Sequence, residues 1–283
     1  MTSGAIPALH PPSDELPPPG VDLLDVMNLE EIDRNLYRSR VVFDEIWPLY
    51  GGQVAAQALL AAARTVPDGR YAHSIYGYFL RPGHSSRPVV LRVERDRDGG
   101  TYSARRVVAL QDGEVILNLS ASFQQAQGGD DLDFRTMPAS IPAPDFLPSS
   151  PPGRLIGFEQ RLPPQPSMVG GFPTRAWMRC TAELTDDRSL HTALLTYLSD
   201  MYTGLGGHPL TPERQQTTLS HAMWFHRPVR VDEWVLMDLL PQVAAGGRAA
   251  YTGTIWDASG RLVASLTQET LFRPRRWKRG ATG

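Results

Sequence analysis

The sequence lacks the features that mark several large classes of protein. Its 283 residues include one cysteine, Cys180, which excludes an internal disulfide and a cysteine-rich metal site. Secreted proteins of this size more often carry paired cysteines, so a reducing, cytoplasmic location is expected. No apolar run reaches the roughly eighteen residues of a membrane span, and the N-terminus has no signal-peptide pattern. We therefore expect no membrane span.

The sequence also lacks an excess of charge of either sign. Its 28 basic and 30 acidic residues give a formal net charge of −2. This balance provides no electrostatic case for binding nucleic acid or an anionic membrane. The length suits one large domain or two fused medium domains.

Common catalytic signatures are missing as well. No G-x-S-x-G elbow supports a serine triad, and no H-E-x-x-H or paired Cys/His spacing supports a metal. We therefore expect no cofactor and no metal. The G-G-Q string at Gly51–Gln53 is neither a phosphate loop nor a dinucleotide fingerprint, but its helix-start amides suit an oxyanion.

The first half of the chain predicts an α+β unit. Residues 1–22 are proline-rich and are expected to form a disordered arm outside the core. A unit at 23–125 follows, in which the stretch 51–66 is apolar on nearly all sides and predicts a buried helix. A further helix is expected at 23–37, and strands are expected at 74–80, 89–94, 102–110 and 115–124.

The second half repeats the first. A Pro- and Gly-rich stretch at 126–167 predicts a linker, and a second unit is expected at 168–283. Its helix is expected at 190–203, and AMWFHRP from Ala222 is similar to GYFLRP from Gly77. Residues 249–268 align with 102–121 without a gap. One unit occurring twice indicates a tandem duplication.

Three polar residues of the second copy are candidates for a site. Gln268 falls in the inward series 262, 264, 266 and 272 of the last strand, where the first copy has Ala121. Asp200 lies near the end of the second helix, where a negative charge opposes the helix dipole. Thr218 precedes a strand. Each alone has an ordinary structural explanation, but together they indicate one active copy and one degenerate copy.

For other polar residues the sequence allows both a functional and a structural role. His73 and His226 are candidate bases or hydrogen-bonded structural residues. The basic tail, from Arg273 to Arg279, is a solvated terminus or a phosphate contact.

Long motifs resemble one known family. They read YGGQVAAQALLAAARTVPD, HSIYGYFLRPG, RDGGTYSARRVVALQDG followed by SASFQ, and SHAMWFHRP. In this order they resemble bacterial acyl-CoA thioesterase II (TesB type), over about residues 29–273. The resemblance implies a double hotdog, with two tandem units that each have a long helix wrapped by an antiparallel β-sheet.

The resemblance also implies the site and the reaction. The family's catalytic residues match Asp200 in YLSDMY, Thr218 in QQTTLSHAMWFH and Gln268 in SLTQET. They would hold a water that hydrolyses acyl-CoA to fatty acid and CoA, as part of lipid metabolism. The segment between Asp200 and Thr218 is shorter than is usual in the family, and Thr217 is the neighbouring alternative to Thr218. A homo-oligomer, dimer or higher, is also implied.

Two other functions remain as alternatives. A double-hotdog enoyl-CoA hydratase or dehydratase needs an Asp and a His close together where the helix opens, whereas here His191 precedes Asp200 in a different arrangement. A non-catalytic acyl-CoA-binding protein would keep the tunnel but not the Asp, Thr and Gln set.

Overall fold

The computed structural model describes residues 20–43, 48–165, 173–201 and 214–274, without the side chains of 214–216 and 274. Residues 1–19 of the expected arm and the basic tail beyond residue 274 lie outside this part. Among the described helices, none combines the length and apolar character needed to cross a membrane.

The described chain runs through two similar series of elements. The first half comprises α1 (Leu23–Met27), β1 (Leu29–Asp33), β2 (Leu36–Ser39), α2 (Gly51–Ala63), β3 (Arg70–Phe79), β4 (Val90–Asp98), β5 (Tyr102–Gln111) and β6 (Glu114–Gln125). A 3₁₀ turn η1 (Pro144–Phe146) leads to β7 (Ser149–Ser150) and β8 (Phe158–Arg161). The second half continues with β9 (Arg175–Cys180), α3 (Arg188–Ser199), β10 (Arg214–Phe225), β11 (Val235–Ala245), β12 (Arg248–Asp257) and β13 (Leu262–Pro274).

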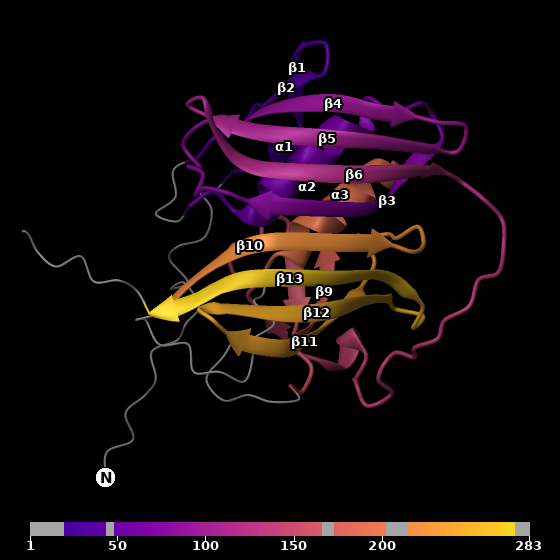
Figure 1. The fold of residues 1–283 in the computed structure, drawn as a ribbon. Helices are drawn as coiled ribbons and strands as arrows, with labels where there is room; N and C mark the ends of the chain where they lie inside the picture. The colour runs from indigo at the N-terminus through magenta and orange to yellow at the C-terminus, as the bar shows by residue number, and fades with distance from the viewer. Residues whose placement is uncertain (1–19, 44–47, 166–172, 202–213, 275–283) are drawn as a thin grey trace, which may run out of the picture.

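The described strands form one antiparallel sheet that spans both halves (Figure 1). Their order is β1-β2-β4-β5-β6-β3-β10-β13-β12-β11-β9-β8-β7, in which the second half mirrors the first. The halves join at β3 and β10, where Ile75 pairs with Met223 and Gly77 with His221. This mirrored order is what a tandem duplication predicts, and it relates α2 to α3.

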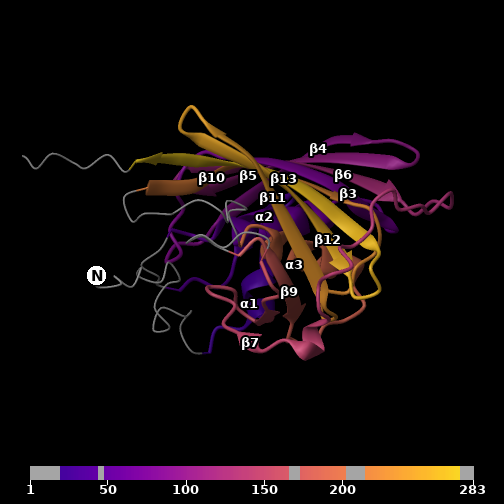
Figure 2. The ribbon, with the colours of Figure 1, turned by 90° about the horizontal axis from the view of Figure 1, so that it is seen from below.

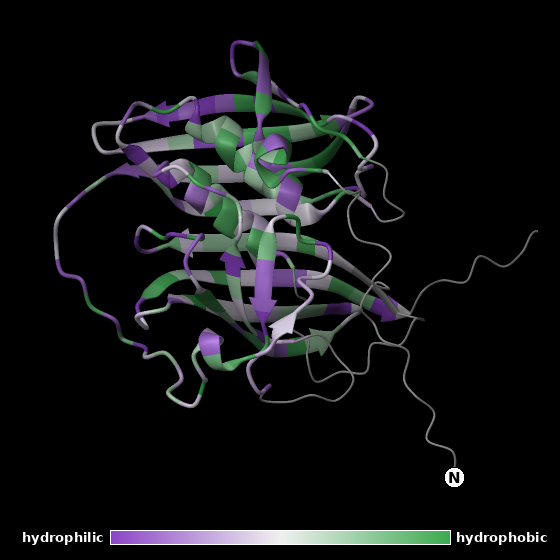
Figure 3. Cartoon of the chain, turned by 180° about the vertical axis from the view of Figure 1, so that it is seen from behind, coloured by the Kyte–Doolittle hydropathy of each residue, from purple (hydrophilic) through white to green (hydrophobic). Residues whose placement is uncertain are grey.

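Both long helices lie on the same side of the sheet (Figure 2). Helix α2 is buried on nearly all sides, with only Gly51 and Ala63 partly exposed. Small alanines let the sheet approach it closely. The main core fills the space between sheet and helices, and the apolar residues of α2 are visible from behind in Figure 3.

Two details of the expected fold are wrong. The helix expected at 23–37 ends at Met27, and β1 and β2 form a hairpin whose turn holds Asn35 at a positive φ of 62°. Arg38 stabilises this hairpin through hydrogen bonds of 3.0 and 2.6 Å to Glu30. Leu262 leaves the inward series because a bulge between β12 and β13 moves it to the other face, where it packs beside Trp256.

The stretch 126–167 contains regular structure. Its β7 and β8 extend the sheet beyond β9. The part before β7 covers the outer face of the second half, where Trp177 Nε1 donates a 3.0 Å hydrogen bond to the Pro142 carbonyl. A small apolar cluster beneath it contains Trp177, Leu236 and Trp256.

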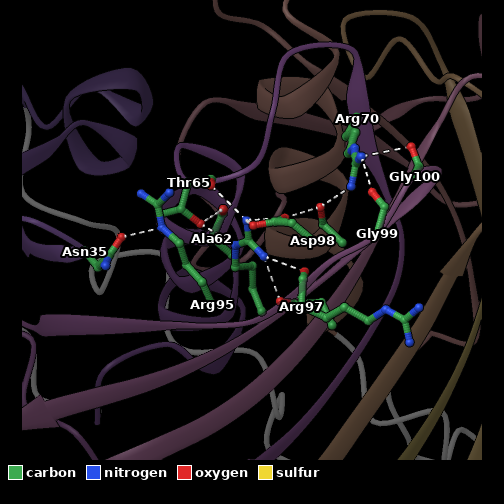
Figure 4. A network of polar contacts seen from close by, with 12 residues as sticks. Asn35, Ala62, Thr65, Arg70, Arg95, Arg97, Asp98, Gly99 and Gly100 are labelled. Atoms are coloured by element: carbon green, nitrogen blue, oxygen red, sulfur yellow. Dashed lines mark hydrogen bonds and ion pairs between the residues drawn. The ribbon is translucent and has the colours of Figure 1, made fainter.

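A buried arginine ties the end of α2 to the first half of the sheet. Arg105 is 1% exposed and donates to both the hydroxyl and the carbonyl of Thr65, at 2.8 and 2.9 Å. Its guanidinium also bonds Asp98, at 2.7 and 3.0 Å. Figure 4 shows Thr65 and Asp98 in this network, with Arg70 extending it to the backbone of Gly99 and Gly100. These bonds satisfy polar groups at the end of a helix.

Candidate active site

Three side chains from three elements meet at the end of α3. Asp200 is the C-cap residue of that helix, and Thr218 and Gln268 project from the neighbouring strands β10 and β13. Thr218 Oγ1 donates to Asp200 Oδ1 at 2.9 Å. Gln268 Nε2 donates to the same oxygen at 2.9 Å and to Thr218 Oγ1 at 2.8 Å. The residues that the sequence nominated separately therefore form one hydrogen-bonded group.

A bulge in β10 selects Thr218 over Thr217. His221 and Met223 face inward, and simple alternation would carry that face to Thr217. The register with β13 shifts between Thr218 and Ser220, so Thr218 pairs with the buried Thr270. Thr217 is exposed. The inward threonine is thus Thr218.

The carboxyl group of Asp200 is enclosed, although the residue as a whole remains partly exposed. Burial raises the pKa of this carboxyl above its ordinary value, because removal from water disfavours the charged form. His221 and the hydrogen bonds from Thr218 and Gln268 act in the opposite direction but do not cancel the burial effect. Asp200 is therefore a stronger base than a solvated aspartate.

The start of α2 closes the other side of the group. A Cβ added at Gly51 would lie closer than 3.0 Å to Asp200 Oδ2, so the carboxylate lies directly against the first turn of this helix. Tyr50 gives α2 no side-chain cap, and its hydroxyl instead donates a 2.7 Å bond to the Tyr197 carbonyl. This bond fixes the start of α2 against the end of α3.

The negative charge of Asp200 also affects the pKa values of two neighbouring tyrosines. The pKa values of Tyr50 and Tyr251 are raised well above the usual value, first by burial and then by the negative charge of Asp200. Arg154, whose guanidinium lies 5.2 Å from the Tyr50 ring centroid, lowers the Asp200 pKa. The site therefore holds one carboxylate among largely buried hydroxyl groups and one nearby cation.

Two buried residues of the group were not predicted from the sequence. His221 Nδ1 lies 2.6 Å from Gln268 Oε1, and its Nε2 lies 2.8 Å from Ser199 Oγ. His221 is 2% exposed and Ser199 is 0% exposed. A signal was present, since His221 opens the HAMWFH strand motif and Ser199 precedes Asp200, but the pairing of His221 with Gln268 is visible only in the sheet register.

The first half lacks the polar group at the related positions. Arg64 is the C-cap of α2, as Asp200 is of α3. Ala72 precedes the matching bulge in β3, and Ala121 pairs with Ile75 as Gln268 pairs with His221. Alanine offers no hydrogen-bonding side chain, so the part of the chain that the structure describes holds one such group.

The other nominated histidines lie apart from this group. His73 Nε2 pairs with Ser122 Oγ at 2.8 Å, and His226 Nε2 with Ser265 Oγ at 2.9 Å. His191 contacts the Thr185 carbonyl at 3.1 Å near the start of α3. Each is hydrogen bonded to a neighbour outside the group around Asp200. Within the described ranges, no cluster of three or more potential ligands for a metal occurs.

Comparison with known proteins shows the family of the chain. The model described as the acyl-CoA thioesterase N-terminal domain matches residues 43–124, and that of the C-terminal domain matches residues 135–272. Acyl-coenzyme A thioesterase 8 of Homo sapiens is 32% identical, over 90% of this chain and 91% of that protein. The chain belongs to the acyl-CoA thioesterase family.

Solved structures agree with the family and its fold. An acyl-CoA thioesterase II, TesB2, from Mycobacterium marinum is 39% identical with a TM-score of 0.75, covering 88% of this chain and 97% of that one. A hot dog fold protein from Alicyclobacillus acidocaldarius has a TM-score of 0.71 at 19% identity, covering 89% and 98%. The predicted family and the α+β double-hotdog fold are thus confirmed.

Proposed function

We propose that the protein hydrolyses acyl-CoA thioesters to free fatty acid and CoA, by direct attack of a water held by Asp200, Thr218 and Gln268. The observation that supports this most strongly is the hydrogen-bonded group of these three side chains against the start of α2. Family membership supplies the substrate class.

Asp200 acts as the general base. Its raised pKa improves proton acceptance from water, since a base works best when its pKa approaches the working pH. The water oxygen bonds to the thioester carbonyl carbon as its proton passes to Asp200. Collapse of the tetrahedral intermediate breaks the carbon–sulfur bond and expels the CoA thiolate. The water attacks the carbonyl directly, so no covalent acyl-enzyme forms. A thiolate leaves readily without a general acid, and the proton on Asp200 then passes to the thiolate or to solvent, which restores the base.

Thr218 and Gln268 orient the base. Among the described residues, the hydrogen bonds to Asp200 all reach Oδ1, while Oδ2 faces Gly51. Both partners thus hold the carboxylate through one oxygen and direct the other toward the start of α2. The proposed water donates to this oxygen, and Thr218 and Gln268 hold it by exchanging to it one of the hydrogen bonds that they make within the group.

The start of α2 stabilises the oxyanion. The helix has no side-chain cap, and the first-turn amides of a helix have no partner within it. A Cβ at Gly52 would run into the Tyr197 carbonyl, so this position requires glycine for the close approach of α2 to the end of α3. The amides of Gly51 and Gly52 are therefore the proposed donors to the negative oxygen.

Release of free thiol from an acyl-CoA tests the proposal. Asp200→Asn should lower kcat by about 10²–10⁴-fold with KM nearly unchanged, because the base is lost and the carboxamide keeps the shape. Asp187→Asn is the matched control. It makes the same change at the N-cap of the same helix, where asparagine caps as well as aspartate, and should leave kcat unchanged.

The same assay separates the alternatives. Only hydrolysis yields free CoA thiol, whereas a hydratase or a binding protein leaves the thioester intact. Near-normal turnover by Asp200→Asn would show that the base is assigned wrongly. The cytoplasmic location, the role in lipid metabolism and the homo-oligomer remain predictions from the sequence.

A further inference from the structure

We propose that His221 is a positioning residue, which donates from Nδ1 to Gln268 Oε1 and so fixes the Gln268 amide with its nitrogen toward Asp200 and Thr218, while Ser199 sets the tautomer of His221. This role rests on the proposed function, since it concerns the residues assigned there to hold the attacking water.

The inventory of protons in the group supports this role. An ionised carboxylate only accepts hydrogen bonds, so Gln268 must present its NH₂ group to Asp200. The second bond from this nitrogen goes to Thr218 Oγ1, whose proton goes to Asp200. The carbonyl oxygen of Gln268 then points the other way and needs a donor. His221 Nδ1, at 2.6 Å, is that donor.

Ser199 completes the chain. A neutral imidazole that carries its proton on Nδ1 has Nε2 as an acceptor, and Ser199 Oγ lies 2.8 Å from it. Ser199 has one hydroxyl proton and a second acceptor in reach, the Thr196 carbonyl at 2.8 Å. Burial lowers the His221 pKa and favours the neutral ring, and a neutral ring that donates from Nδ1 can bond Ser199 only by accepting its proton at Nε2.

The internal duplication provides an independent line of support. Matching helix ends and strand registers relate five polar residues of the second half to five residues of the first that cannot form this chain. The related pairs, with the residue of the second half first, are Ser199 and Ala63, Asp200 and Arg64, Thr218 and Ala72, His221 and Ile75, and Gln268 and Ala121. His221 and Ser199 are thus present with the three proposed water-holding residues and absent with them. A residue needed only for packing has no reason to follow that pattern.

A double-mutant cycle tests the role. His221→Ile copies the residue of the first half and should lower kcat by about 10- to 100-fold with little change in KM, because the Gln268 carbonyl loses its donor and the amide is free to turn. If His221 acts through Gln268, the same change in a Gln268→Ala background should alter kcat by less than about twofold.

Further variants separate positioning from packing. His221→Asn keeps an N–H donor near the place of Nδ1 and should recover most of the loss, and Ser199→Ala should lower kcat by about 3- to 10-fold. His226→Ile is the matched control, since His226 directly follows the same strand, has its own serine partner, and should leave kcat unchanged. Thermal unfolding of each variant checks the fold.

The tautomer gives a readout that packing alone does not determine. In the ¹⁵N NMR spectrum at neutral pH, His221 should carry its proton on Nδ1. A proton on Nε2 alone, an equal loss in His221→Asn and His221→Ile, or full additivity with Gln268→Ala would overturn the role. If Asp200→Asn and Gln268→Ala keep their activity, the proposed function fails instead; if they lose it while His221→Ile does not, only the positioning role fails.

Discussion

Gly51→Ala should lower kcat by about 10²-fold while leaving the fold intact. The added methyl group would lie closer than 3.0 Å to Asp200 Oδ2, and 3.1 and 3.3 Å from two ring carbons of Phe79. The carboxylate is the far end of a side chain and can yield more easily than the backbone. It has to move by on the order of 1 Å to reach ordinary van der Waals distance.

This movement is small for stability but large for catalysis. Asp200 is held through Oδ1 by Thr218 and Gln268, so a shift of the carboxylate lengthens both bonds. A displacement of about 1 Å in a catalytic group lowers the rate by about 10²-fold, equivalent to roughly 2.7 kcal/mol in the activation barrier. Alanine favours helix over glycine, by up to about 1 kcal/mol in a helix interior, so α2 itself should not be weakened.

Steady-state thiol release and thermal unfolding, measured together, check this prediction. Gly100→Ala is the matched control, because a Cβ there meets no atom within 4 Å, and it should behave as wild type. Gly52→Ala should instead destabilise the protein, since its methyl group meets the Tyr197 carbonyl, which is backbone. Wild-type kcat in Gly51→Ala would refute the placement of a catalytic carboxylate against α2.

Two further predictions concern pH and the buried arginine. Because burial raises the pKa of Asp200, the acid limb of the kcat/KM profile should lie above the ordinary aspartate range. The folded state binds this proton more tightly than the unfolded state, so the free energy of unfolding falls as pH rises from the ordinary pKa to the raised one. Asp200→Asn should therefore melt at a higher temperature than wild type at neutral pH. Arg105→Met should lower the free energy of unfolding in urea by about 2–4 kcal/mol, because the polar groups of Thr65 lose a charged donor, whereas Arg106→Met on the exposed face should not change it measurably.

Repetition made much of the fold predictable from the sequence. The alanine-rich composition of α2 and the alternation in β6 located a buried helix and a half-buried strand, and the second copy provided an independent test of the same pattern. The helix expected at 23–37 failed because local periodicity does not reveal the β1–β2 hairpin, whose strands are held by pairing with each other and with β4. Pairing of this kind depends on contacts across the sheet.

The residue types of the candidate site could be picked out from the sequence, but the hydrogen bonds between them could not. Asp200 and Gln268 stood out by comparison with the first copy, because each replaces a residue of different chemistry at the related position. His221 did not, since its significance lies in facing Gln268 across β10 and β13. Ser199 was not predicted for the same reason, since its contact with His221 is visible only in the fold.

Thr217 and Thr218 show how one bulge decides an assignment that the sequence left open. Two adjacent threonines have the same chemistry, and strict alternation from His221 favours Thr217 as the inward residue. The shifted register instead turns Thr218 inward, where its hydroxyl bonds Asp200.

Alanine at each threonine position in turn tests this register. Thr218→Ala should lower kcat by about 10- to 100-fold, because Asp200 loses a donor and Gln268 loses an acceptor. Thr218→Ser keeps the hydroxyl and should retain most of the activity. Thr217→Ala, on the exposed face, should leave turnover unchanged. If Thr217→Ala were the inactive variant and Thr218→Ala the active one, β10 would run without its bulge, and the hydrogen-bonded group around Asp200 would have to be rebuilt on the other threonine.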